Sequence, residues 1–339
     1  MSRLCTGVLP LVTLTLVACS GGRSESKKRA FRSRSIFRGV VWGPPTEAPR
    51  RARSSLLDGP GVSFFVAADT HFGYPGIRHW NRLKVQAMNS LTGTAYPRAL
   101  GGRVRRPLGV LMAGDLTNDG KPRQWKEFVR FYGLKGRDGL LHFPLFEGTG
   151  NHDYHGKRRT VANAVRRRHG GLNYTWSWHG VHFMCLDTHP RFASRRWLRQ
   201  KLRRIGKREP VILYFHYSII GPYSNWWTSL AKRTFRRDID GYNVIAIFHG
   251  HFHHSFHYRW EGLDVYNVGS PRHGSRSFAV ATVTANHLTV ASWNYEHKHW
   301  SWHHQKRLRP GPNPTLLPPA PSKPPGLPLK QIRTRTGLP

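Results

Sequence analysis

Apolar runs of strand length alternate with segments of helical periodicity through the middle of the chain. The runs contain almost no polar positions, as expected for strands that are buried on both faces. They comprise residues 62–68, 107–113, 143–146, 211–215 and 244–248. Between them, apolar side chains recur at the spacing of one helix face in residues 80–91 and 122–132, and we also expect a basic helix at 158–168 and a further helix at 194–205. This alternation predicts a sheet that is covered by helices.

The second half of the chain adds strands that are not separated by helices. Residues 174–178 and 181–186 flank His179 and Gly180 and predict a hairpin. Further stretches with a strand pattern follow at residues 256–260, 263–268, 278–283 and 287–293. We therefore expect an α/β fold in which two packed mixed β-sheets are flanked by helices.

Polar side chains directly follow each of the five buried runs. They are Asp69 and His71, then Asp115, then Asn151 with His152 and Asp153, then His216, and finally His251 and His253. The carboxyl ends of strands gather at one edge of an α/β sheet, so these side chains are expected to converge there. Borderline metals favour such mixed nitrogen and oxygen ligands. With one carboxylate shared, the set can hold two metals about 3.5 to 4 Å apart.

The loop of residues 148–153 places an amide, an imidazole and a carboxylate on successive positions. Asn151 offers a neutral oxygen ligand, and His152 offers a nitrogen that can carry a proton near neutral pH. Asp153 offers an acceptor that can hold this imidazole in one tautomer. The loop alone is weak evidence, as is a single His-x-His in a chain with 21 histidines. The five clusters together predict the metal site.

The order of the motifs is similar to that in the calcineurin-like metallophosphoesterase superfamily. The chain resembles a member of the bacterial lipoprotein type. The motifs are Asp-x-His, Gly-Asp, Gly-Asn-His-Asp, a lone histidine after a strand, and Gly-His-x-His, from Asp69 to His253. The resemblance implies a four-layer αββα sandwich with two divalent metal ions. It assigns Asp69, His71 and His253 to one metal, Asn151, His216 and His251 to the other, and Asp115 to both. It also implies that His152 faces the phosphate, with Asp153 behind it.

The implied chemistry is hydrolysis of a phosphomonoester or phosphodiester. Two cations neutralise the phosphoryl charge and acidify a water, so that a metal-bridging hydroxide attacks in line. His152 would then act as a general acid, which is worth ~10² to 10⁴ in rate. Purple acid phosphatases carry an iron-binding tyrosine three residues after the bridging aspartate, and this chain has Asn118 there. We expect no violet chromophore, and Mn, Fe, Zn and similar ions remain open.

The first 19 residues are typical of a bacterial export signal. Arg3 precedes an apolar segment, and residues 16–19, Leu-Val-Ala-Cys, resemble a lipobox in which Cys19 becomes lipidated. A plain secretory signal with a chance cysteine is the alternative. The expected location is outside the cytoplasm, anchored by lipid to a bacterial membrane at the periplasm or cell surface. Once Cys5 is removed and Cys19 carries lipid, only Cys185 remains, in an apolar run that predicts a buried, inert thiol.

Composition divides the rest of the chain into a basic tether at residues 20–60, the metallophosphoesterase domain at 61–305 and a Pro-rich disordered tail at 306–339. The net charge is +37, with 54 Lys and Arg against 17 Asp and Glu. Ten basic residues lie at positions 23–53 and seven from Lys306 onward, so about +22 remains within the domain. Either an Arg-rich composition covers a solvated surface, or the charge attracts anionic partners such as a membrane surface or nucleic acid.

The residues that border the substrate, here called the rim, are the hardest to identify from the sequence. Trp226 and Trp227 follow the His216 strand and either stack on the substrate or cap the core. Tyr154 and Arg272 are rim candidates by loop position only. Three functions compete: an extracytoplasmic phosphomonoesterase or phosphodiesterase, a nuclease, and a non-catalytic lipoprotein that binds an anionic polymer or lipid. We favour the first, and the complete ligand set argues against the third.

Overall fold

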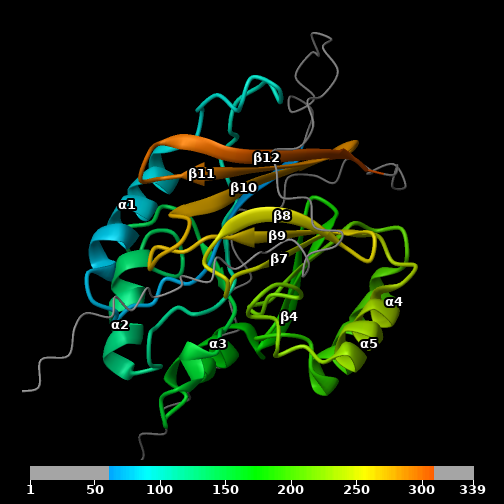
Figure 1. The fold of residues 1–339 in the computed structure, drawn as a ribbon, viewed down its shortest axis with the longest axis horizontal. Coiled ribbons are helices and arrows are strands. Elements are labelled where there is room, and N and C mark those ends of the chain that lie inside the picture. Colours follow the sequence, from blue (N-terminus) through cyan, green and yellow to red (C-terminus); the bar gives the residue numbers. More distant parts are fainter. Residues whose placement is uncertain (1–60, 309–339) are drawn as a thin grey trace, which may run out of the picture. The chain divides into compact units, whose positions relative to one another are not determined.

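The computed structural model describes residues 61–308 (Figure 1). The expected export signal with Cys19, the tether at residues 20–60 and the tail beyond residue 308 lie outside the described residues. No helix in the described part is long and apolar enough to cross a membrane.

The described strands form two six-stranded sheets. The first has the order β12 (His299–Arg307), β11 (His287–Asn294), β10 (Ser277–Thr284), β1 (Gly61–Ala67), β2 (Val110–Met112) and β3 (Leu145–Glu147). The second has the order β4 (Asn173–Trp178), β5 (Val181–Leu186), β6 (Val211–Tyr214), β7 (Val244–His249), β9 (Leu263–Val268) and β8 (Ser255–Trp260). Each sheet mixes parallel and antiparallel pairs, such as β1 parallel to β2 and antiparallel to β10. The predicted pair of mixed sheets is confirmed.

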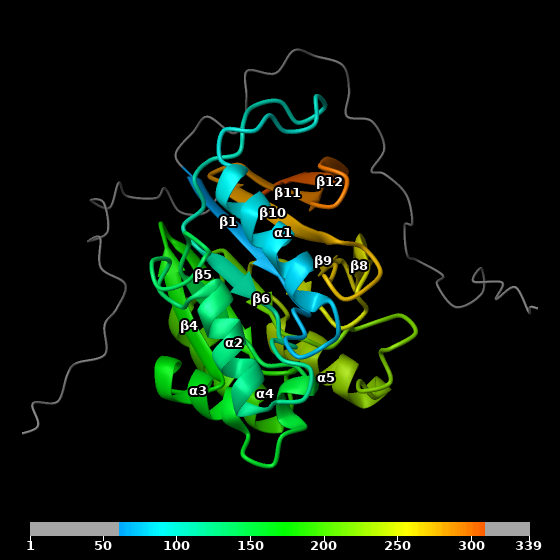
Figure 2. The ribbon, with the colours of Figure 1, turned by 90° about the vertical axis from the view of Figure 1, so that its left-hand side faces the viewer.

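Helices cover the outer faces of both sheets (Figures 1 and 2). They are α1 (Ile77–Ser90), α2 (Pro122–Tyr132), α3 (Thr160–His169), α4 (Phe192–Ile205) and α5 (Ser229–Ile239), with a short 3-10 helix at His152–Tyr154. Side chains from α1 and α2 pack on the first sheet, and those from α4 and α5 pack on the second. α2 begins at Pro122 and is capped at its end by Gly133, as predicted, because proline suits a first helical position and Gly133 takes a positive φ.

The core between the sheets is rich in aromatic side chains. The ring of Phe64 on β1 makes edge contacts with Phe183 on β5, at 5.1 Å between centroids, and with Phe248 on β7, at 6.1 Å. Side chains alternate along β5, so that Phe183 and Cys185 face the first sheet while Met184 and Leu186 face α4 and α5. Cys185 is a buried free thiol, as expected, and burial raises its pKa to about 12.

Two elements were not predicted from the sequence. α5 buries only Phe235 and Ile239, so its apolar periodicity is faint, although Thr228 caps its first turn by accepting a hydrogen bond from Ala231 N. β12 is a half-buried edge strand made of Trp, His, Ser, Gln, Lys and Arg, and its sequence pattern cannot be told from that of a loop. Because β12 ends at Arg307, the folded domain extends two residues beyond the boundary expected at residue 305.

The aromatic contacts between the sheets make Phe64 a sensitive test of the sandwich. We expect Phe64→Ala to lower the free energy of unfolding by about 3 to 5 kcal/mol, because the large cavity lies in a rigid interface between two sheets. Urea denaturation followed by tryptophan fluorescence measures the change. Leu140→Ala, at a side chain that is 43% exposed, is the control and should change stability by less than about 0.5 kcal/mol. Equal effects of the two substitutions would contradict the assigned core.

Candidate metal centre

The predicted ligands come together at one end of the sandwich. Asp69 and His71 follow β1, Asp115 follows β2, and Asn151 follows β3 in the first sheet. His216 follows β6, and His251 and His253 follow β7 in the second. Backbone hydrogen bonds join these loops, because His71 N donates to Asp115 O and Gly250 N donates to His216 O. The parallel strands of both sheets therefore deliver their ligands to a common edge, as predicted.

One group of ligands consists of Asp69, His71 and His253. Nε2 of His71 lies 3.1 Å from Nε2 of His253, and Nε2 of His253 lies 3.4 Å from Oδ1 of Asp69. All three side chains are buried, and their ligand atoms lie within 4.8 Å of one another. Burial lowers the pKa of His71 to about 3, so its imidazole is neutral at physiological pH, which is the form that binds metals.

The other group consists of Asn151, His216 and His251. Nε2 of His216 lies 3.1 Å from Oδ1 of Asn151 and 3.2 Å from Nδ1 of His251. Nδ1 of His216 donates to the carbonyl of Ala113 at 2.9 Å, which turns Nε2 toward the site. Burial alone would lower the pKa of His216, but Asp115 beside it raises this pKa to about 9, so a bound cation would take the place of the proton on Nε2. Burial lowers the pKa of His251 to about 3, and this imidazole is neutral, like that of His71.

Asp115 lies between the two groups. Its Oδ2 is 3.2 Å from Nε2 of His216 and 3.7 Å from Nε2 of His71, so one oxygen faces ligands of both groups. Its Oδ1 accepts a hydrogen bond from the backbone N–H of His152 at 2.9 Å. Burial alone would raise the pKa of Asp115, but His216, His71 and His152 hold it well below its usual range. A buried carboxylate is thus kept ionised at the position expected for a bridging ligand.

The backbone around the centre is strained. Ten described residues other than glycine have a positive φ, and five of them are predicted ligands: Asp69, His71, Asp115, His251 and His253. Left-handed conformations of this kind cost about 1 to 3 kcal/mol each and concentrate at functional sites. Two glycines let the loops approach closely, because a Cβ at Gly150 would lie 2.1 Å from Oδ1 of Asp115 and one at Gly250 would lie 2.4 Å from Oδ2 of Asp69.

These residues fit a pair of divalent cations. Ligand atoms bound to one zinc-like ion at about 2.0 to 2.2 Å lie roughly 3.4 Å apart in tetrahedral geometry. The separations of 3.1 to 3.9 Å within the two groups bracket that value. Asp69, His71 and His253 would hold one ion and Asn151, His216 and His251 the other, with Asp115 shared.

His152 is positioned beside both groups but is oriented by the backbone. Its Nδ1 lies 2.7 Å from the carbonyl oxygen of Asn118. Because a carbonyl can only accept, Nδ1 carries the proton, and Nε2 is left for exchange with a substrate. The ring contacts that of His71 edge-on at 4.7 Å between centroids. His152 also forms a compact group with His71 and Asp115, so its imidazole borders the centre.

Asp153 does not have the role expected from its position after His152. Its carboxylate accepts hydrogen bonds from the backbone N–H groups of Leu116, Thr117 and Gly150 and from the hydroxyl of Thr117, at 2.8 to 3.1 Å. The two residues lie in a 3-10 helix, in which successive side chains point about 120° apart. The prediction that Asp153 orients His152 is therefore wrong. Asp153 instead joins the loops that carry Asp115 and Asn151.

The two tryptophans that were predicted to lie at the rim differ in their exposure to solvent. Trp226 is 48% exposed and stacks on Tyr217 at 4.9 Å, and Tyr217 in turn contacts the ring of His251 at 4.8 Å. Trp227 is 4% exposed and packs on Phe215 and Phe235, so it caps the core and the rim prediction for it is wrong. Trp226 remains a candidate for contact with the substrate, whereas Trp227 follows the alternative of capping the core.

Tyr154 and Arg272 also lie at the loops of the centre. The hydroxyl of Tyr154 donates to Asp187 at 2.7 Å, which ties it to the loop after β5. The guanidinium of Arg272 lies over the ring of Tyr74, 4.3 Å from its centroid, at the loop that follows His71. Tyr223 is a rim residue that the sequence analysis missed; it is 55% exposed and lies 6.1 Å from the ring of His251.

Two further residues that the sequence analysis missed support the ligands. Nδ1 of His273 lies 2.8 Å from Nδ1 of His253, and the hydroxyl of Ser270 donates to the carbonyl of Asp69 at 3.0 Å. Both lie in the loop between β9 and β10. The sequence offered one signal for them, which is that this loop follows the strand expected at residues 263–268; the structure shows that this strand is parallel to β7.

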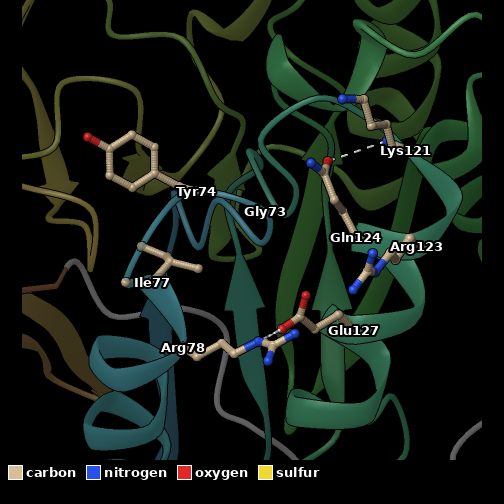
Figure 3. A pocket seen from close by; sticks show the side chains of 9 residues that line it. Gly73, Tyr74, Ile77, Arg78, Lys121, Arg123, Gln124 and Glu127 are labelled. Atoms are coloured by element: carbon tan, nitrogen blue, oxygen red, sulfur yellow. Dashed lines mark hydrogen bonds and ion pairs between the residues drawn. The ribbon is translucent and has the colours of Figure 1, made fainter.

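A cavity of about 380 Å³ lies between the loop after His71 and the start of α2 (Figure 3). It is lined by Tyr74, Arg78, Gln124 and Glu127 among others, and Arg78 faces Glu127 in an ion pair. None of the predicted metal ligands lines this cavity. It is therefore a neighbour of the metal centre and not the reaction site.

The observed role of Asp153 can be tested by Asp153→Asn. Its amide group would face backbone N–H donors, so we expect a loss of about 1 to 3 kcal/mol of stability together with reduced metal content. Thermal unfolding and elemental analysis measure both. If only the turnover rate fell, with stability and metal content intact, Asp153 would be acting on His152 after all.

Comparisons with known proteins agree with this geometry. Residues 62–255 match the family model of the calcineurin-like phosphoesterases. No curated protein matches the chain. Among solved structures, a dimetal phosphatase from Danio rerio is similar with a TM-score of 0.55 and 14% identity, covering 73% of this chain and 99% of the other.

Two other structures share the fold. GAP50, the anchor in the inner membrane complex of Plasmodium, has a TM-score of 0.55 and 13% identity over 74% of this chain and 90% of the other. The purple acid phosphatase PPD1 of yellow lupin has a TM-score of 0.53 and 12% identity over 73% of this chain and 54% of the other. The family match covers more than half of the chain and includes every predicted metal ligand. The chain belongs to the calcineurin-like phosphoesterase family and is a metal-dependent phosphoesterase.

Proposed function

We propose that the protein hydrolyses a phosphomonoester or phosphodiester at a dinuclear metal centre, with His152 as the general acid. The observation that carries the proposal is the position of His152. Its Nδ1 is held by the carbonyl of Asn118, and its ring borders both Asp115 and His71. A proton donor is thus placed beside two ligand groups that share one carboxylate, which is the arrangement that ester cleavage with a poor leaving group requires.

The chain's residues divide the work of the proposed reaction. When bound, two divalent ions would neutralise the phosphoryl charge and acidify a water molecule. Asp115 fixes the spacing of the two ligand groups and, through Oδ1, holds the backbone of His152. Nε2 of His152 donates a proton to the departing oxygen, while Nδ1–H stays bonded to Asn118. The hydrogen bond from Nδ1–H to this carbonyl fixes the orientation of the ring.

The rim favours a substrate whose leaving group has an apolar or aromatic part. Tyr223 exposes its ring 6.1 Å from that of His251, and the exposed ring of Trp226 stacks on Tyr217, which contacts His251. Exposed aromatic rings of this kind can stack on a base, a sugar or a lipid edge. Arg272, over Tyr74, adds a positive charge at the same set of loops.

The proposed setting is outside the cytoplasm, on an anionic membrane. The support for this lies in the sequence: the lipobox-like ending at Cys19 and the net charge of +37. Lys and Arg near a membrane surface contribute about 1 kcal/mol each to its binding. The charge also supports a nuclease, since contacts with phosphate dominate non-specific binding of nucleic acid.

A binding role without turnover is the second candidate from another class. GAP50, which shares the fold, is described as an anchor in a membrane complex. Assays of metal-reconstituted protein on p-nitrophenyl phosphate, bis-p-nitrophenyl phosphate and single-stranded DNA separate the candidates. We expect hydrolysis of at least one ester; a metal-loaded protein that hydrolyses none of the three would favour binding alone.

His152→Ala tests the general acid. The substitution keeps the backbone N–H that bonds Asp115, so we expect unchanged metal content and a decrease of ~10² to 10⁴ in kcat on alkyl esters. The decrease should be smaller on p-nitrophenyl esters, because nitrophenolate leaves without protonation. His155→Ala, at the neighbouring exposed imidazole, is the matched control. Full activity of His152→Ala on alkyl esters would refute the assignment.

Asp115→Asn tests the shared ligand. The amide lacks the charge that two cations require, so we expect at least one metal equivalent to be lost from the purified protein. Elemental analysis after desalting gives the count. Asp119→Asn makes the same chemical change in the same loop, at a carboxylate that bonds Gln124, and should retain the full complement. Equal metal content in both variants would show that Asp115 is not a ligand.

A further inference from the structure

A second group of metal-ligand side chains lies at the open edge of the sandwich, apart from the catalytic ligands. His257 comes from β8, which is the edge strand of the second sheet, and Asp264 comes from β9 beside it. His304 comes from β12, the edge strand of the first sheet. The group therefore joins the two sheets, and Figure 1 shows β12 and β8 along the same side of the molecule.

The three side chains converge on one carboxylate oxygen. Nε2 of His257 lies 2.9 Å from Oδ1 of Asp264, and Nε2 of His304 lies 4.0 Å from the same oxygen. The two imidazole rings stack at 3.9 Å between centroids. One ligand atom from each residue lies within 4.8 Å of the others. Ligands of one tetrahedral ion lie roughly 3.4 Å apart, so small side-chain rotations would bring all three atoms into range.

A hydrogen bond from the surrounding residues orients one imidazole of the group as in a metal site. Nδ1 of His304 lies 2.8 Å from the hydroxyl of Tyr266. If Nδ1 donates this hydrogen bond, Nε2 keeps its lone pair toward Asp264, as in metal-bound histidines generally. The Asp264 carboxylate is buried and both imidazoles are half-buried, so a water molecule can complete the coordination from the solvent side.

Lys306 is the feature that argues against a cation. Its Nζ lies 2.6 Å from Oδ2 of Asp264. It occupies the oxygen that the histidines do not face, and Oδ1 remains on the side of the two imidazoles. A purely ionic network of His257, Asp264, His304 and Lys306 is thus the alternative, and it makes different predictions about metal content.

We propose that His257, Asp264 and His304 form a third divalent metal site, which takes a borderline ion such as Zn²⁺ and links the edges of the two sheets. Two imidazoles and one carboxylate with an open position suit such an ion. The role of such an ion would be structural, because it would join strands of different sheets. The site would hold β12, the last described strand, against the sandwich.

Metal content of the full chain tests the site. After treatment with a chelator, the wild type, His304→Ala and His303→Ala are equilibrated with Zn²⁺, desalted and analysed for zinc. His303 precedes His304 on the same strand, and its side chain points to the other face of β12, so it is the matched control. We expect His304→Ala to hold one equivalent less than the wild type and His303→Ala to hold the same amount.

The same comparison in the Asp115→Asn background separates this site from the catalytic centre. The difference of one equivalent should persist there even where catalytic metals are lost, so failure of the proposed catalytic centre leaves the test intact. Equal zinc content in the wild type and His304→Ala, in both backgrounds, would overturn the proposal.

Thermal unfolding distinguishes a metal site from an ionic network. With free Zn²⁺ about a hundredfold above the dissociation constant, the site should raise the Tm by roughly 5 to 10 °C. In the Asp115→Asn background, we expect His304→Ala to lose this zinc-dependent increase while it unfolds near the parent temperature in chelator. A loss of Tm that is the same with zinc and with chelator would mean that His304 serves the ionic network only.

Discussion

The Asp115 carboxylate is the contact on which the arrangement of the metal centre depends. It follows a strand of the first sheet, yet its Oδ2 lies 3.2 Å from His216 of the second sheet and 3.7 Å from His71 of its own. A buried carboxylate is costly unless charges and hydrogen bonds compensate it. Here the compensation comes from imidazoles of both sheets and from the backbone of His152. The residue that would bridge two ions therefore also ties the two halves of the sandwich at their shared edge.

This geometry requires a stable scaffold. Five ligands adopt left-handed backbone conformations, each of which costs about 1 to 3 kcal/mol. The loops are held there by contacts with one another, such as the bond from His71 N to Asp115 O and the four donors to Asp153. The aromatic packing of Phe64 against Phe183 and Phe248 lies beneath them and fixes the distance between the sheets. The core packing therefore helps to offset the free-energy cost of the strained backbone, together with the contacts between the loops.

The ligands could be predicted from the sequence because their position follows from a simple rule: each directly follows an apolar strand, and the ends of parallel strands share an edge. The roles of neighbouring residues could not be predicted in this way. Asp153 adjoins His152 in sequence, but the 3-10 turn points their side chains apart. Trp226 and Trp227 are likewise adjacent, and one lies on the rim while the other lies in the core. The sequence analysis did not predict α5 and β12, because few of their side chains are both apolar and buried.

The division between ligands and rim has a physical cause that bears on specificity. Metal ligands are fixed by strands and by compensating charges, so little of their chemistry can vary without loss of the centre. The rim is made by the longer loop after His216, in which Tyr223 and Trp226 are exposed. Because Trp226 reaches His251 only through Tyr217, a change in this loop can alter the surface presented to a leaving group while the ligands stay in place. The metal ligands and the proposed substrate rim thus lie in different parts of the chain, and the loop after His216 can change without moving the ligands.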